Sequence, residues 1–282
     1  MGRADVLTGI AALGSILMAG ALGGAYVYLR SDLAFAQAAD SLVDVAGAII
    51  LTLAVRVGRT PRDSRHPMGH SRAEPLGALA IAALATVLAF EVGKSAVATL
   101  LGRPDVRLTG LLLGLFVAKV VFKAVLFAYA RADRGPAVRA LAVDARNDML
   151  VGAVAVIGFF AARFGARSLD AGLALPLALW IGWSGLALGK ENIDLLMGIA
   201  PSQARQGDLL ALAASVPGVI DAHDLRAHYL GSELSVHVHI SVPGELTVRQ
   251  GHDIGEAVRV LLFAESDVVD CTVHVDPVDA PD

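Results

Sequence analysis

The sequence predicts an α-helical membrane protein with six transmembrane helices, followed by a smaller cytoplasmic α+β domain. The chain of 282 residues is 55% hydrophobic and only 18% charged, with a mean hydropathy of +0.62. Soluble domains carry more charge and fewer long apolar runs. Apolar runs long enough to cross a bilayer recur until about residue 190. Beyond about residue 200 polar residues increase, and six of the eight histidines lie there.

The six predicted transmembrane helices are read directly from these apolar runs. They cover residues 5–29, 33–57, 75–101, 108–130, 140–163 and 171–189. The first run is long enough to span and has no evident cleavage site, so we expect no signal peptide. The domain boundary then falls between a transmembrane domain, 1–199, and a cytoplasmic domain, 200–282.

The arginines of the loops predict the orientation in the membrane, because cytoplasmic loops carry an excess of positive charge. The second-to-third and fourth-to-fifth connections contain Arg59, Arg62, Arg65, Arg72, Arg131, Arg134 and Arg139. The loops on the opposite side contain fewer, namely Arg30, Arg103, Arg107, Arg163 and Arg167. With an even number of spans, both termini and the second domain are predicted to be cytoplasmic.

Two pairs of aspartates lie within the predicted spans. Asp40 and Asp44 are four residues apart in the second span, and Asp144 and Asp148 repeat that spacing in the fifth. Residues four apart share one face of a helix. Ionisable groups in a bilayer are costly and usually mark a polar pathway, so four carboxylates on two packed helices predict a cation site. The alternative is that these aspartates lie at helix ends among lipid headgroups.

Other charged residues in the spans are Lys119 and Lys123 in the fourth and Glu91 in the third. For these we expect side chains that extend to the interface, or an ion pair between helices, rather than a role in transport.

The loop after the second span contains Asp63, His66 and His70. One carboxylate and two imidazoles within eight residues form a plausible metal-ligand set. A polar loop whose histidines contact only solvent explains the same composition.

The C-terminal region has the pattern of a ferredoxin-like αββαβ domain. A helix (202–215), two strands (219–229, 233–242), a helix (247–262) and a last strand (267–276) are predicted. Apolar residues alternate with Ser235, His237 and His239 on the second strand, and with Thr272, His274 and Asp276 on the last. With His223 and His252 elsewhere in the domain, this set favours metal binding over isolated surface histidines.

Composition also excludes some classes of protein. A net charge of −4 and a pI near 6.0 give no reason to expect nucleic acid as a partner. The single cysteine, Cys271, excludes an internal disulfide framework and a multi-cysteine zinc site. No prosthetic group is expected, only bound divalent metal ions.

Taken together, the two aspartate pairs, the Asp63-x2-His66-x3-His70 loop followed by Arg72 and Glu74, and the order of the elements resemble the cation diffusion facilitators. These are proton-coupled exporters of divalent metals, and the resemblance covers essentially the whole chain. It implies a homodimer in the cell (inner) membrane of a bacterium, with lipid around it and with metal ions and protons as substrates. It also implies three metal sites, which are a transport site, a loop site and a cytoplasmic site.

The resemblance assigns ligands to each of these sites. The transport site would be Asp40, Asp44, Asp144 and Asp148, and the loop site would be Asp63, His66 and His70. The metal-binding and dimerisation domain would use His223, His239, His252, His274 and Asp276, while His237 matches less well and His228 has no counterpart.

Two positions depart from the pattern of the family. Zinc-transporting members typically carry histidine where this chain has Asp144, and a site of carboxylates alone suits harder ions. We therefore expect Mn²⁺ or Fe²⁺, ahead of Zn²⁺, Co²⁺ and Cd²⁺. Some members also pair a base after the loop with an acid near the end of the sixth span. Here the aligned residue is Met197, and Asp194 is the nearest acid that Arg72 would use.

Two alternatives of other classes stay open at this point. One is an intramembrane aspartyl-type metalloenzyme that uses Asp40 and Asp144 as a dyad; the chain has no His-Glu-x2-His motif, and each aspartate has a second one on the same face. The other is a metal sensor of the same fold that does not transport.

Overall fold

The computed structural model describes residues 3–29, 32–101, 110–133, 135–163 and 168–278. Arg30, Arg103, Arg107, Arg134 and Arg167, which entered the prediction of orientation, lie outside the described residues. The chain forms two compact units, Met1–Ile193 and Asp194–Asp282.

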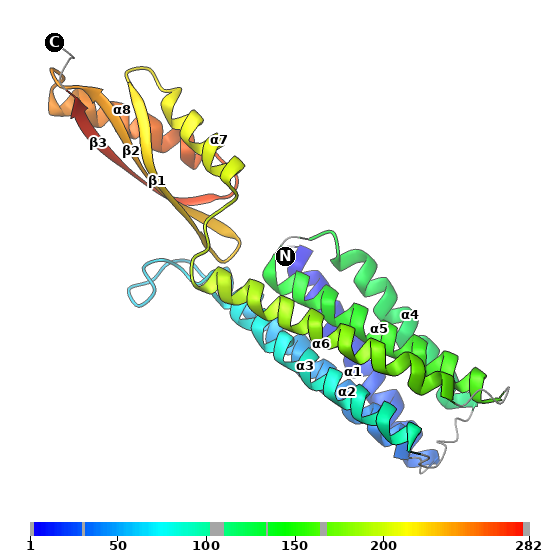
Figure 1. The fold of residues 1–282 in the computed structure, drawn as a ribbon. Coiled ribbons are helices and arrows are strands. Elements are labelled where there is room, and N and C mark those ends of the chain that lie inside the picture. The colour runs from blue at the N-terminus through cyan, green and yellow to red at the C-terminus, as the bar shows by residue number, and fades with distance from the viewer. Residues whose placement is uncertain (1–2, 30–31, 102–109, 134, 164–167, 279–282) are drawn as a thin grey trace. The chain divides into compact units, whose positions relative to one another are not determined.

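Six long helices make up the first unit and are drawn from blue to yellow-green in Figure 1. They are α1 (Arg3–Leu29), α2 (Asp32–Gly58), α3 (Ala73–Leu100), α4 (Gly110–Ala130), α5 (Pro136–Arg163) and α6 (Ser168–Leu196). Helix α1 packs on α2 and α4, α2 packs on α3, and α5 packs on α3 and α4. The six predicted helices are thus confirmed.

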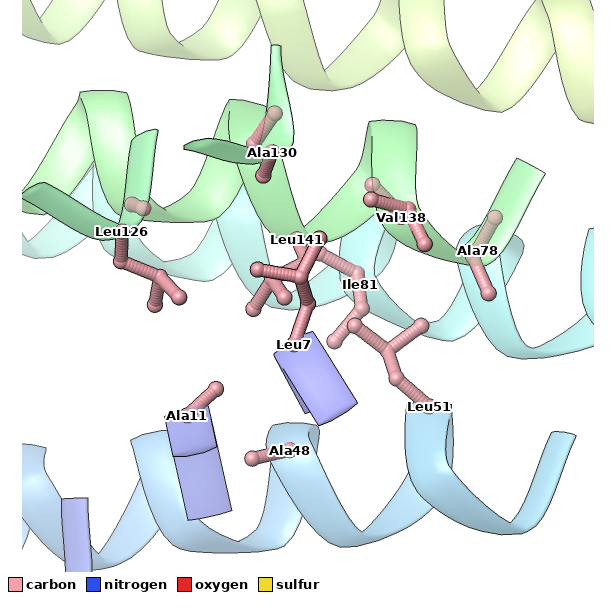
Figure 2. Close-up of a cluster of buried hydrophobic side chains, with 14 of the residues drawn as sticks. Leu7, Ala11, Ala48, Leu51, Ala78, Ile81, Leu126, Ala130, Val138 and Leu141 are labelled. Atoms are coloured by element: carbon pink, nitrogen blue, oxygen red, sulfur yellow. The ribbon is translucent and has the colours of Figure 1, made fainter. Parts of the chain in front are cut away.

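The core of the first unit lies where the helices meet, and it includes Leu188 of α6. Figure 2 shows its side chains pointing into the space between the helices. Those labelled there come from α1 to α5 in pairs, namely Leu7 and Ala11, Ala48 and Leu51, Ala78 and Ile81, Leu126 and Ala130, and Val138 and Leu141. Four of these ten are alanines, so the helices approach closely, as is typical of helices packed within a bilayer.

Two glycines permit a close approach between helices. A Cβ added to Gly152 of α5 would lie 2.5 Å from a methyl group of Val120 on α4. One added to Gly77 of α3 would lie 2.6 Å from Ala54 on α2. These contacts hold α4 against α5 and α3 against α2, and α2, α4 and α5 are the helices that carry the intramembrane charges.

Five described helices are long and apolar enough to cross a membrane, and α5 is the exception among the six. Its N-terminal half carries Arg139, Asp144, Arg146 and Asp148. Two of these charged residues, Asp144 and Asp148, belong to the candidate site. The sixth helix continues to Leu196, past the predicted limit of 189. Lys190 and Glu191 end the apolar run there but do not end the helix.

The second unit has the predicted αββαβ order. It contains α7 (Gln203–Ala214), β1 (Asp221–Leu230), β2 (Glu233–Pro243), α8 (Val248–Phe263) and β3 (Val268–Val278). The sheet order is β1-β2-β3, with β1 antiparallel and β3 parallel to β2. Ser202 caps α7, and Thr247 forms a capping box with Gln250 at the start of α8.

Both helices cover one face of this sheet (Figure 1). Leu209 of α7 and Val258 and Leu262 of α8 pack against Val236 and Ile240 of β2 in a common core. Because side chains alternate along a strand, the residues between these apolar positions point to the other face. The helices therefore leave the histidine-bearing face of the sheet uncovered.

Candidate metal sites

The first candidate site lies between α2, α4 and α5. Carboxylate oxygens of Asp44, Asp144 and Asp148 all lie within 4.8 Å of one another. The side chains of Asp44 and Asp148 are 9% and 6% exposed. Three buried carboxylates at this spacing can ligate one cation, because metal–oxygen distances are about 2.0–2.6 Å. The structure thus brings three of the four predicted aspartates together.

Asp40 lies one turn before Asp44 on α2 and outside this group of three. Its side chain is 37% exposed, and its Oδ2 accepts a hydrogen bond of 2.6 Å from Lys119 Nζ. Its link to the other carboxylates runs through that lysine, since Lys119 Nζ is also 3.1 Å from Asp44 Oδ2.

Lys119 and Lys123 of α4 complete the site. Lys123 Nζ lies 3.3 Å from Asp44 Oδ1 and 3.3 Å from Asp144 Oδ2, and it also contacts Asp148. Both lysines form ion pairs with other helices, as one of the two expectations for them predicted. What the sequence analysis missed is that their partners are the four site aspartates. The spacing of four that Lys119 and Lys123 share with both aspartate pairs was the signal for it.

Neighbouring polar residues of α5 face other partners. Arg146 stacks over the ring of Trp180, with its guanidinium carbon 5.5 Å from the ring centroid. Asn147 donates to Ser184 Oγ of α6 at 3.3 Å. On α3, Glu91 pairs with Lys94 at 2.6 Å, three residues along the same helix. These contacts fix helices and lie apart from the carboxylate group.

The second candidate site is the loop between α2 and α3. His66 Nδ1 lies 3.2 Å and His70 Nε2 3.6 Å from the carboxylate of Asp63. Asp63 accepts backbone hydrogen bonds from His66 and Arg65, which hold the pKa of its carboxyl below the ordinary value. His70 Nδ1 donates to the Thr60 carbonyl at 3.2 Å, which directs the Nε2 side of the ring toward Asp63. All three predicted loop residues are brought together.

The third candidate site lies on the uncovered face of the sheet. Strand register places His223, His239 and His274 side by side on β1, β2 and β3. Asp276 contacts all three, at 3.6 Å from His223, 3.0 Å from His239 and 3.1 Å from His274. Ligand atoms of His223, His239 and Asp276 lie within 4.8 Å of one another. The side chain of His274 is 62% exposed and adjoins this group from β3.

Hydrogen bonding prepares this cluster for a cation. The hydrogen bond from His239 Nδ1 and the neighbouring histidines hold the pKa of Asp276 below its ordinary value, so the carboxylate is ionised near neutral pH. Asp221, which sequence reasoning missed, lies 3.4 Å from His223 Nδ1. It is two residues before His223 on the same strand, and side chains two apart on a strand share a face.

Not every predicted histidine joins the cluster. His252 is exposed on α8, one turn before Glu256, and belongs to none of the candidate groups in the described part of the chain. His228 and His237 stack on each other with ring centroids 6.5 Å apart, further along the same sheet face. Cys271 is turned to the core, away from the histidine-bearing face, and burial raises the pKa of its thiol to about 11.

Comparison with known families matches both units of the chain. A model of the cation efflux transmembrane domain matches residues 9–197. A model of the cytoplasmic domain of cation efflux proteins matches residues 201–278.

Individual proteins are similar over nearly the full length. An uncharacterized transporter of Methanocaldococcus jannaschii is 31% identical over 258 residues, which cover 90% of this chain and 91% of that protein. The cation-efflux pump FieF of Salmonella arizonae is 28% identical over 257 residues, covering 90% of this chain and 86% of the pump. A solved nickel form of the MamM C-terminal domain is 31% identical, with a TM-score of 0.27, over 27% of this chain and 99% of that domain.

Proposed function

The chain belongs to the cation diffusion facilitator family of cation-efflux transporters, and we propose that it exports a divalent transition-metal ion from the cytoplasm in exchange for protons. It is an integral membrane transporter and not an intramembrane enzyme. The substrate we propose is Mn²⁺ or Fe²⁺, ahead of Zn²⁺, Co²⁺ and Cd²⁺.

One observation carries this proposal, which is the convergence of Asp44, Asp144 and Asp148 in the helical unit. The described residues of the spans supply no histidine or cysteine to this group, so its donors are all carboxylate oxygens. Oxygen donors suit harder ions such as Mn²⁺, whereas imidazole nitrogen favours zinc. Asp40 is the fourth carboxylate of the proposed site and is reached through Lys119.

The proposed cycle is alternating access by a homodimer, and the match to the cytoplasmic dimerisation-type domain supports that assembly. The aspartates bind the ion while ionised and facing the cytoplasm, where both termini are placed in this proposal. On the outer side protons compete the ion off, because carboxylate ligands must be deprotonated to hold a metal. Return of the protonated site completes metal/proton antiport.

The loop and sheet clusters would bind the same ions outside the membrane. Asp63, His66 and His70 would form the loop site. His223, His239, His274 and Asp276 would form the cytoplasmic site, with His252 contributed at the dimer interface. Metal that binds the cytoplasmic cluster in one arrangement of the dimer more tightly than in another shifts the equilibrium toward that arrangement. The pairing of Arg72 with Asp194 stays a prediction.

The direct test is transport by the purified full-length protein in proteoliposomes. We expect inward Mn²⁺ or Fe²⁺ gradients to drive flux together with opposite proton movement, followed by a pH-sensitive dye in the lumen. Wild-type vesicles that carry none of Mn²⁺, Fe²⁺, Zn²⁺, Co²⁺ or Cd²⁺ above protein-free vesicles would disprove the function. Metal flux without a pH change would disprove the antiport alone.

A further inference from the structure

Three helices each present two charged residues with a spacing of four to the same place. Helices α2 and α5 contribute the aspartate pairs, and α4 contributes Lys119 and Lys123. The lysine side chains are 9% and 3% exposed, so their ammonium groups are enclosed with the carboxylates. A buried charge is tolerated only with a partner, and here the partners are the proposed metal ligands.

The Lys123 ammonium lies within the set of ligands itself. It contacts one oxygen each of Asp44, Asp144 and Asp148, the three residues whose carboxylates approach one another. A metal ion bound to these oxygens would lie at about 2.0–2.6 Å from each. It would therefore occupy the space of the ammonium group, and two cations cannot share it.

We propose that Lys123 is a tethered counter-cation that competes with the substrate metal for Asp44, Asp144 and Asp148, assisted by Lys119. This inference rests on the proposed function, because it concerns the same transport site. Metal entry withdraws the Lys123 ammonium from the ligands, and metal release lets it return. Because the lysine is held on α4, its return is intramolecular and needs no diffusion.

The lysines also set the charge that the site presents to a substrate. Four ionised carboxylates and two ammonium groups would together give the site a net charge of −2. One divalent cation neutralises it completely. Without the lysines a net negative charge would remain in the membrane after the metal had bound, which holds the metal more tightly and slows its release. The lysines thus select a doubly charged ion and weaken its binding enough for export.

The test compares Mn²⁺ binding by full-length wild type and Lys123→Met, which keeps the length and apolar stem but removes the charge. Lys94→Met is the matched control, because Lys94 forms an exposed ion pair with Glu91 on α3. Transport-site binding is defined as the component that Asp148→Asn abolishes. We expect Lys123→Met to bind Mn²⁺ at least about tenfold more tightly, because the ammonium group no longer repels the metal ion. A tenfold change corresponds to a modest share of the repulsion between two charges this close. In proteoliposomes its KM for Mn²⁺ and its maximal flux should both fall.

A second measurement uses only the wild-type protein and so does not depend on folding of the variant. The chain has four lysines, Lys94, Lys119, Lys123 and Lys190, so amine labelling followed by mass spectrometry resolves each. Saturating Mn²⁺ should change the labelling of Lys123 by several-fold and leave Lys94 unchanged. Unchanged Lys123 labelling, or a folded Lys123→Met dimer with equal, weaker or no Mn²⁺ binding, overturns the inference.

Failure of this inference and failure of the proposed function give different results. Wild-type flux of a divalent metal with unaltered affinity in Lys123→Met rejects the tethered cation and leaves the transporter intact. Tighter binding in Lys123→Met with no flux of any divalent metal by the wild type supports competition at the site and rejects the transport function.

Discussion

The helical site and the sheet cluster offer different ligand atoms in different surroundings, carboxylate oxygens between helices and mostly imidazole nitrogens on the sheet. In the helical site, Asp44 and Asp148 are enclosed, and each of the four aspartates contacts a lysine of α4. On the sheet, Asp276 is partly exposed and contacts three histidines, whose side chains are also partly exposed to solvent. A buried carboxylate needs a permanent partner, and an exposed one does not. In the proposed mechanism a metal would therefore displace an ammonium group in the membrane, whereas the sheet cluster is made of imidazoles and carboxylates.

The largest expected effect separates the helical site from every other cluster. Asp44→Asn, Asp144→Asn and Asp148→Asn should each lower Mn²⁺ flux in proteoliposomes at least about 100-fold, because each removes a ligand of a site with few others. Asp40→Asn should lose less, since Asp40 lies outside the group of three. Glu91→Gln is the control, as its only described partner of opposite charge is Lys94. Robust flux in two of the three central variants would show that the site lies elsewhere.

The next effect concerns selectivity within the same site. Asp144→His exchanges a hard oxygen donor for a nitrogen donor, which should raise the ratio of Zn²⁺ to Mn²⁺ flux by about tenfold. Asp40→His is the matched comparison, because it introduces the same ring one turn away from the converging oxygens. Competition assays with both metals measure the ratios. An unaltered ratio in Asp144→His would mean that residues other than this ligand set the selectivity.

The sequence predicts the helices and strands of both regions. All six membrane helices and the αββαβ order follow from apolar runs and strand alternation. So does the histidine face of the sheet, since a period of two assigns each residue to a face. The end of α6 was placed too early because an apolar run reports membrane contact, and a helix continues into water when its hydrogen bonds allow it.

Contacts between elements were harder to predict than the elements. The spacing of Lys119 and Lys123 indicated a shared face, but which helix that face meets depends on small-residue contacts such as Gly152 against Val120. Asp221 joins the sheet cluster because it lies two residues before His223 on β1, a spacing that the sequence analysis did not use. His252 is the opposite case. It was predicted to be a metal ligand, but within one chain it lies exposed on the surface of α8.

A smaller effect tests whether the sheet cluster responds to metal. Residues 200–282 contain a complete core of their own. Metal that binds the folded form stabilises it by about 2.7 kcal/mol at 100 times Kd, so the melting temperature of this fragment should rise by several degrees with Zn²⁺ or Mn²⁺. His239→Ala combined with His274→Ala should abolish the rise. His252→Ala should reduce it only at concentrations where the fragment is dimeric. Equal shifts in wild type and the double variant would leave the histidines without a role in sensing.

The smallest effect is expected at the loop site. Asp63 and His66 are exposed, as the sheet cluster partly is, and the loop directly connects helices α2 and α3. The triple variant Asp63→Ala, His66→Ala and His70→Ala should remove one bound metal per protomer and lower flux only about twofold. The reason is that these exposed side chains contact one another and the Thr60 carbonyl, and none of their described contacts reaches the intramembrane carboxylates. Elemental analysis of the purified dimer counts the metals, and Arg65→Ala serves as a control in the same loop. Unchanged metal content in the triple variant would show that these residues bind no metal. Loss of flux as complete as in Asp148→Asn would place the loop on the transport path.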